Sequence, residues 1–207
     1  MIPVHVLALR YLNNCAPSLL RALGAPADCP SLGILTTDCD DATYIALDQA
    51  TKDAEVTVIY GGSFYGGASN ASTPNAGEVI GILAGKTPGA VRSGMESALR
   101  ILENLGFSDV KGVPCLHYTV TSAGRFLAEE AGVPTGTALA YLIAPPLEAL
   151  YALDAAMKAA EVHLCKLYAP PTQTNFGGAL LSGTQSACDA ACAAFSQAVE
   201  EVALRPQ

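Results

Sequence analysis

The sequence is poor in charge, and its basic residues are especially few. Charged residues make up 14% of the 207 residues against 51% hydrophobic ones, and 11 Lys and Arg stand beside 19 Asp and Glu. Because these basic residues are scattered, no basic stripe exists that could displace counterions from a nucleic-acid backbone. We therefore expect no nucleic-acid partner. A surface with so few charged residues favours a chain that buries part of its surface against other copies of itself.

Long apolar runs and short catalytic motifs are also missing. No run of about 20 apolar residues could span a bilayer, and the first residues lack the pattern of a secretory signal, so we expect no membrane association and no secretion. Gly-x-Ser-x-Gly, His-Glu-x-x-His, the Walker lysine loop and the dinucleotide glycine fingerprint are absent. We expect no catalytic residues and no cofactor.

The seven cysteines form no Cys-x-x-Cys pair. Cys188 and Cys192 share one face of an expected helix, which favours reduced, structural cysteines over a redox or metal role. Of the three histidines, His5 and His163 lie in expected strands and are interpreted as structural. His117 has no evident partners, so we predict no metal site.

A helix-to-strand segment occurs twice, at Tyr44–Val56 and Leu150–Val162. The offset is 106 residues, and eight of the eleven positions from Ala46 to Val56 are identical. A repeat of this length is too long for a solenoid, so we predict two tandem copies of one domain, at residues 1–106 and 107–207. Within the repeats, Asp48 with Lys52 and Asp154 with Lys158 are i, i+4 pairs, each stabilising a helix by about 0.2–0.5 kcal/mol.

Both halves follow one order of expected elements: strand, helix, strand, helix, strand, loop, strand, helix. The predicted fold is α/β (α+β), with a small, mainly antiparallel sheet and flanking helices in each half. The loop Gly61–Gly77 has no periodicity and is eight residues longer than its counterpart Ala169–Gly177. Loops this long in compact domains are usually functional or disordered, so we expect function at these two loops.

Acidic residues are densest at Asp38, Asp40 and Asp41, just before an expected helix. Capping of that helix by Asp38 or Asp40 is one interpretation. The alternative is a site for a cation or an amine, which Glu78 could join from the far end of the long loop.

The repeated Ala-x-Asp-x-Ala-x-Lys-x-Ala-Glu-Val pattern resembles the bacterial microcompartment shell domain. The tandem arrangement, with circularly permuted strand order, resembles the ethanolamine-utilization shell proteins of the L type. Further matching stretches are Ser31–Gly33, Asp40–Ala46, Ala76–Val79, Ala140–Ala149, Thr174–Phe176 and Ser182–Cys188. Pro145–Ala149 and Thr174–Asn175 are specific to that type.

The resemblance implies a structural, non-enzymatic protein of a microcompartment shell within the cytoplasm. It implies a homotrimer whose six domains form a flat disc, which tiles with other shell proteins through Lys52 and Lys158 at its lateral edge. It also implies a gated central pore for metabolites, framed by the two loops. The loop residues concerned are Gly61, Gly62, Ser63, Phe64, Tyr65, Gly66, Gly67, Pro170, Pro171 and Thr172.

The family also binds ethanolamine in small pores within each subunit. The matching positions are Asp40, Asp41, Glu78, Phe107, Thr174, Asn175 and Phe176. Carboxylates would pair with the ammonium group, and an aromatic face attracts a cation. A zinc site known in the family would match Glu148 and, less directly, His117; we predict no metal here.

Two other functions stay open from the residues alone. A pair of small-molecule-binding regulatory domains would form a discrete oligomer and no shell. An enzyme using the acidic group would need a base of near-neutral pKa in an enclosed pocket.

Overall fold

The computed structural model describes residues 1–64 and 77–207, and they form two compact units. The N unit carries the first copy of the repeat and the C unit carries the second. The N unit consists of Pro3–Leu105 with Gly124–Leu127, and the C unit consists of Met1–Ile2, Gly106–Ala123 and Ala128–Gln207.

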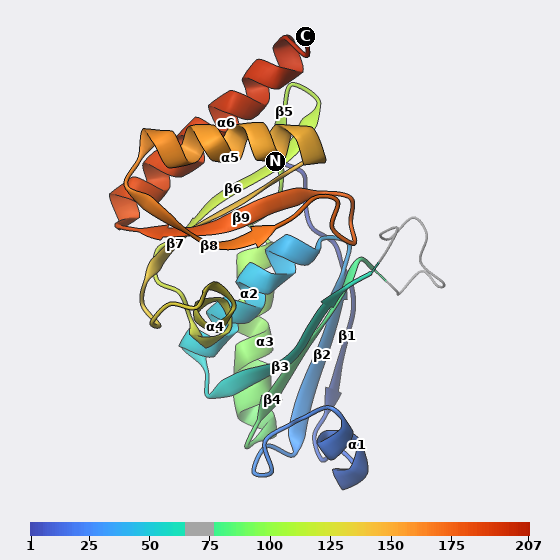
Figure 1. Ribbon diagram of the computed structural model, residues 1–207. Coiled ribbons are helices and arrows are strands. Elements are labelled where there is room, and N and C mark those ends of the chain that lie inside the picture. The colour runs from blue at the N-terminus through green and yellow to red at the C-terminus, as the bar shows by residue number, and fades with distance from the viewer. Residues whose placement is uncertain (65–76) are drawn as a thin grey trace. The chain divides into compact units, whose positions relative to one another are not determined.

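The N unit is a four-stranded antiparallel sheet, of order β1-β2-β4-β3, with α2 and α3 packed on one face (Figure 1). On its other face the short helix α1 places Leu20 and Leu23 against Leu32 and Ile82. The helix α3 begins where the Thr87 hydroxyl accepts the N–H of Ala90. The elements are β1 (Val6–Leu12), α1 (Pro17–Ala22), β2 (Ser31–Thr37), α2 (Asp40–Asp53), β3 (Val56–Ser63), β4 (Val79–Gly85) and α3 (Pro88–Leu102).

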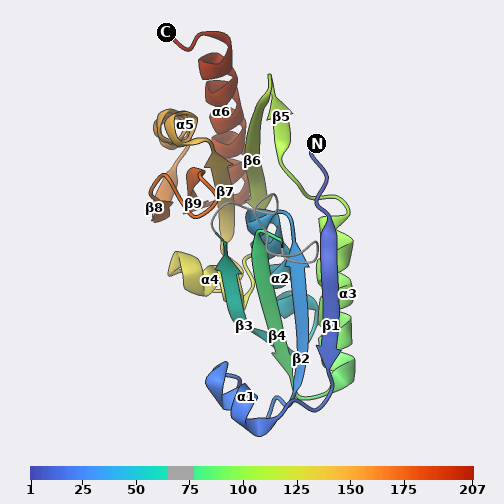
Figure 2. The same cartoon turned by 90° about the vertical axis from the view of Figure 1, so that its right-hand side faces the viewer.

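The C unit repeats this plan with one strand more, in a five-stranded antiparallel sheet of order β5-β6-β7-β9-β8. The helices α5 and α6 cover one face of this sheet, as both views show (Figure 1, Figure 2). Its elements are β5 (Ser108–Val110), β6 (Val113–Val120), α4 (Arg125–Ala131, whose first three residues belong to the N unit), β7 (Ala138–Ala144), α5 (Pro146–Ala159), β8 (Val162–Tyr168), β9 (Gly177–Gly183) and α6 (Gln185–Leu204).

The core of the C unit lies between α5, α6 and the sheet. Ala152 and Ala156 of α5 are fully buried with Cys188 and Phe195 of α6. Small side chains on α5 let the two helices approach closely, so that a Phe ring and a thiol fill the space between them. All seven cysteines of the described residues are free, which agrees with the structural interpretation of the thiols.

The edge strands of the two sheets share an irregularity. A bulge separates Val58 from Tyr60 in β3, and another separates Leu164 from Lys166 at the matching place in β8. The opposite edge strand of the N unit, β1, is bulged between Val6 and Ala8, whereas β5 has only three residues. Among the described residues, no helix is both long and apolar enough to cross a bilayer.

The structure confirms the predicted order of elements and corrects three points. The strand β5 was not predicted. The residues Gly61–Ser63, predicted as loop, extend β3 and pair with β4. Neither Asp38 nor Asp40 is the N-cap of α2: Cys39 holds that position, with no side-chain cap. Asp38 instead accepts the N–H of His5 at 2.7 Å, and Asp40, inside the first turn, accepts the N–H of Asp41 at 2.9 Å.

Candidate functional site

The predicted acidic residues of the N unit lie together at the start of α2. Asp40 and Asp41 open the helix and are both buried. Burial raises the pKa of the Cys39 thiol, and the carboxylates of Asp41, Asp40 and Glu78 raise it further. The N–H of Glu78 donates to the Thr37 carbonyl, so Glu78 lies near the start of α2 although 37 residues separate it from Asp41 in the sequence. The N unit holds three carboxylates in one small region.

Two further side chains join this group, and sequence reasoning missed both. The Ser63 hydroxyl donates to Asp40 Oδ2 at 2.7 Å. The Tyr44 hydroxyl, one helical turn after Asp40, hydrogen-bonds the same Ser63 oxygen. The hydrogen bond from Ser63 to Asp40 was not predicted, because the sequence around Ser63 is typical of a Gly-Ser loop. In the structure Ser63 is the last residue of the paired strand β3. The hydroxyls fix one oxygen of Asp40, so the carboxylate is held in a defined orientation.

Glu78 is positioned by its own backbone. Its N–H donates to the Thr37 carbonyl at 2.8 Å, and its carbonyl accepts the N–H of Phe64 at 2.7 Å. Gly77 precedes it at a place where a Cβ would lie 1.7 Å from the Thr37 oxygen. Only glycine fits so close an approach, and Gly77 therefore lets the chain enter β4 with Glu78 bonded to the Thr37 carbonyl, just before α2.

The other predicted ligands form a second group, in the C unit. The rings of Phe107 and Phe176 meet edge to face, with centroids 5.3 Å apart. The segment before Phe176 is a closed turn: Thr172 N–H donates to the Phe176 carbonyl, and Asn175, at φ 65°, donates to the Thr172 carbonyl. The hydroxyls of Thr172 and Thr174 are 3.4 Å apart. The C unit thus brings the hydroxyls and the Phe176 ring of one short connection together with the Phe107 ring, which precedes β5.

The predicted pore residues fall into three classes. Gly61, Gly62 and Ser63 lie in β3, and Phe64 follows it as an exposed residue. Tyr65, Gly66 and Gly67 lie outside the described residues. Pro170, Pro171 and Thr172 lie in the connection between β8 and β9.

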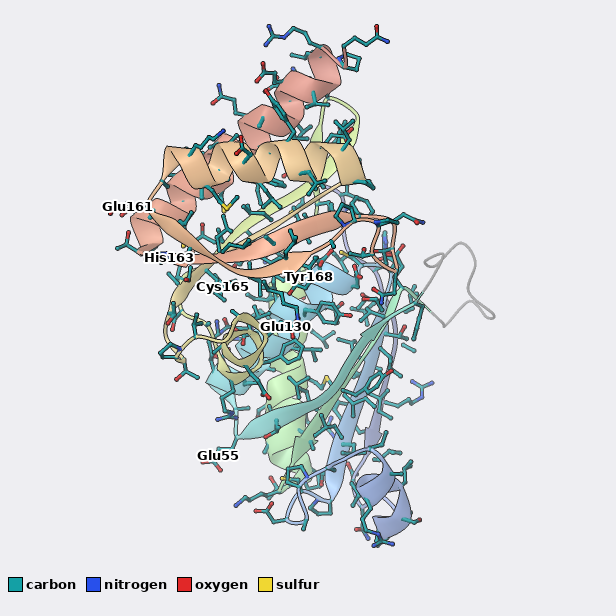
Figure 3. All side chains as sticks on the ribbon, viewed as in Figure 1. Glu55, Glu130, Glu161, His163, Cys165 and Tyr168 are labelled. Carbon is teal, nitrogen blue, oxygen red and sulfur yellow. The ribbon has the colours of Figure 1, made fainter. Side chains whose placement is uncertain are left out.

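The strand that leads into this second connection is anchored at its end. Tyr168 donates to Glu130 Oε1 at 3.5 Å, and Figure 3 shows these two labelled side chains near each other. Lys166 Nζ lies 3.2 Å from the same carboxylate oxygen. The ring of Tyr168 also stacks on that of Tyr141. These contacts fix β8 up to the residue before the connection begins.

The two lysines at matching positions have different environments. Lys52 Nζ lies 3.6 Å from Asp48, and the lysine side chain is 25% exposed. Lys158 Nζ lies 2.6 Å from Asp154, and its side chain is 75% exposed. The predicted i, i+4 pairs are confirmed in both copies. Lys158 is much more accessible than Lys52.

His117 is half-buried in β6, and burial lowers its pKa. Within residues 1–64 and 77–207, no group of three or more His, Cys, Asp or Glu side chains could hold a metal ion. His5 pairs with Asp38 through its ring, Nδ1 to Oδ2 at 2.7 Å, which agrees with its structural interpretation.

Comparison with known proteins identifies the family. Residues 31–114 match the BMC domain. The chain is 51% identical over its whole length to the bacterial microcompartment shell protein EutL of Clostridium perfringens, covering 97% of that protein. The chain belongs to the EutL family of bacterial microcompartment shell proteins. The crystal structure of EutL from Leptotrichia buccalis matches with a TM-score of 0.96 and 53% identity, over 99% of this chain and 96% of that one. At 18% identity the trimeric shell protein PduB shares the fold, with a TM-score of 0.77 over 94% of this chain and 87% of that one.

Membership of the EutL family confirms the predicted fold of tandem shell domains and the structural role. The relatives are named as bacterial microcompartment shell proteins, and this chain is a structural shell protein of the same family. The protein is a component of a bacterial microcompartment for ethanolamine utilization.

Proposed function

We propose that this shell protein assembles as a ring of three copies, which tiles into the shell and surrounds a gated pore, and that each subunit binds ethanolamine. The ring is supported by the two like halves of the chain, because three copies of a two-domain chain give six near-equivalent edges that pack in a plane. It is also supported by PduB, a trimeric shell protein of the same fold.

The observation that carries ethanolamine binding is the placement of three carboxylates at the start of α2: Asp40 and Asp41 open the helix, and the N–H of Glu78 donates to the Thr37 carbonyl just before it. Ethanolamine is a small cation at neutral pH, and buried or half-buried carboxylates bind an ammonium group through charge-assisted hydrogen bonds. Ser63 holds Asp40 in place and is itself close to the Tyr44 hydroxyl. An ordered carboxylate loses little conformational entropy when it binds a ligand.

The resemblance also assigns Phe107, Thr174, Asn175 and Phe176 of the C unit to ethanolamine binding. These side chains suit ethanolamine, since their hydroxyls can bind its alcohol group and an aromatic face attracts its cation. Phe176 carries no hydroxyl of its own, so Thr174 would supply the hydrogen bond to the alcohol oxygen.

The gate is assigned to the connections that follow β3 and β8. A ligand that binds better when the connections close the pore would hold the gate shut through that difference in affinity. Tiling is assigned to the lateral edge at Lys52 and Lys158.

Calorimetric titration with ethanolamine tests the site. Removing one charge-assisted hydrogen bond costs about 1.5–3 kcal/mol, so Asp41→Asn should weaken binding about tenfold or more. Glu96→Gln, which changes an exposed carboxylate of α3, is the matched control and should bind as the unchanged protein does. Equal affinity of Asp41→Asn and the unchanged protein would contradict the assignment.

Electron microscopy and native mass spectrometry test the assembly. We expect a mass of three chains and discs with a central hole that extend into sheets. A monomer, or a discrete oligomer that forms no sheets at any concentration, would contradict the shell assembly and favour a regulatory oligomer.

A further inference from the structure

We propose that the segment Ala16–Leu19 of one copy docks on the exposed face of α5 in a second copy, at Tyr151, Asp154 and Met157. This inference rests on the proposed ring and identifies its joint between chains. The argument comes from the N unit, where the matching contact already exists.

In the N unit the segment Gly124–Leu127 lies on α2. The buried carboxylate of Asp48 accepts two backbone N–H groups, from Gly124 at 2.8 Å and from Leu127 at 2.9 Å. The hydroxyl of Thr51, one turn further along α2, accepts the N–H of Arg125 at 3.1 Å. One face of α2 is therefore satisfied by the backbone of a four-residue segment, and the Leu127 side chain is buried there.

The second repeat contains the counterparts of both partners. On α5, Asp154 matches Asp48 and Met157 matches Thr51, at the offset of 106. The segment Ala16–Leu19 matches Gly124–Leu127, at an offset of 108. Two structural markers fix this second register: Gly24 and Gly132 both have positive φ, 70° and 66°, and Ala25 N–H bonds Leu20 as Val133 N–H bonds Ala128.

Both counterparts are uncovered in the single chain. The Asp154 side chain is 61% exposed, whereas that of Asp48 is fully buried. Leu19 is 45% exposed, whereas Leu127 is 1% exposed. Tyr151 and Met157 are also large exposed side chains on α5. Since neither surface is covered within one chain, a second copy is the partner that carries the matching surface.

A paired difference between the repeats supports this partner. In the N unit the N–H of Arg125 donates to the hydroxyl of Thr51. In the proposed contact between chains, Pro17 takes the place of Arg125 and Met157 takes the place of Thr51. Proline has no N–H to donate, and methionine has no hydroxyl to accept. Donor and acceptor are thus lost together, so the docked segment would leave no unsatisfied polar group at this position, while the carboxylate of Asp154 is kept.

In the proposed contact between chains, the docked segment lies further from its helix than Gly124–Leu127 lies from α2. A Cβ at Gly124 would lie 2.5 Å from Thr51 Oγ1 and 2.6 Å from the Asp48 carbonyl, so this position requires glycine. Ala16 has a Cβ and must stand further from α5. The longer side chains of Met157 and Tyr151 fill that space and meet Leu19, so the joint between chains is more apolar than the contact within the chain.

The contact is asymmetric, and this asymmetry makes a ring. Each copy offers one segment and one α5 face, and these are different surfaces. Such head-to-tail contacts close into a cycle when the rotation between copies permits it.

A disulfide test uses the double variant Pro17→Cys, Met157→Cys, whose positions match a pair with backbone nitrogen and hydroxyl oxygen 3.1 Å apart. After mild oxidation, a non-reducing gel should show covalent dimers and trimers that a reductant removes. Each single variant carries the seven native thiols and should remain monomeric on the gel. Absence of cross-linked species from the double variant would overturn the inference.

Native mass spectrometry of a second variant separates this inference from the proposed ring. Leu19→Asp should raise the concentration at which the trimer dissociates at least tenfold. Leu204→Asp changes a still more exposed apolar residue at the end of α6 and should not. If Leu19→Asp remains as trimeric as the unchanged protein, this joint is wrong although the ring stands. If the unchanged protein itself is monomeric, both proposals fail.

Discussion

Replacing Asp48 by alanine should destabilise the folded chain severely, because this one side chain satisfies two buried N–H groups. The variant would leave the amides of Gly124 and Leu127 without an acceptor. A buried donor left unsatisfied costs about 1–3 kcal/mol, so the two together should lower the free energy of unfolding by about 2–6 kcal/mol. For a chain of this length, 1 kcal/mol corresponds to about 2–4 °C in the midpoint of thermal unfolding.

The expected fall in the midpoint for Asp48→Ala is therefore at least about 4 °C. Thermal unfolding followed by circular dichroism measures it, at one fixed protein concentration because assembly makes the midpoint concentration-dependent. Asp48→Asn keeps one oxygen for one N–H and should lose about half as much. Glu96→Ala, on the exposed side of α3, is the control and should change the midpoint by less than about 1 °C. A midpoint for Asp48→Ala within 1 °C of the control would refute the assigned role of the carboxylate.

Three further perturbations have defined outcomes. Gly77→Ala should lower the free energy of unfolding by more than about 2 kcal/mol, measured by urea unfolding, since its Cβ would overlap the Thr37 carbonyl; unchanged stability would contradict that close approach. Burial raises the pKa of Cys115 from 9.0 to about 12, so the folded protein keeps a proton that the unfolded chain loses. Stability should therefore fall as pH rises from about 9 to 12, by about 1.4 kcal/mol at pH 10 from this thiol alone, and Cys115→Ala should remove that part of the loss. Lys158→Ala should reduce sheet formation seen by electron microscopy, whereas Lys86→Ala should not; intact sheets from Lys158→Ala would place the tiling contact elsewhere.

The fold was predictable because two copies of one pattern constrain each other. The repeat at Tyr44–Val56 and Leu150–Val162 predicts a helix followed by a strand, and the structure has α2 with β3 and α5 with β8 there. The additional strand β5 was missed because it has only three residues and pairs across the turn at Lys111 and Gly112. So short an element has no periodicity that a pattern could reveal.

The grouping of the acidic residues was predictable from the sequence, but the hydrogen bonds around them were not. The acidic group was found from the density of charge, but Asp38 was misread as a cap because its partner His5 is 33 residues away. Ser63 was missed for the same kind of reason: its strand is specified by pairing with Val79 in β4 and not by its Gly-Ser context. Long-range partners override local preference in both cases.

All four edge strands of the two sheets have a feature that hinders the addition of a further strand. Three of them, β1, β3 and β8, are kinked by an inserted residue, and the fourth, β5, is only three residues long. A bare, straight border would invite backbone pairing with any neighbour, which is how sheet proteins aggregate. In a shell, many copies of the protein lie side by side at high local concentration. Its sheets must therefore not pair edge to edge into fibrils. Association with neighbouring copies therefore depends on side-chain contacts and not on backbone hydrogen bonding at the sheet edges.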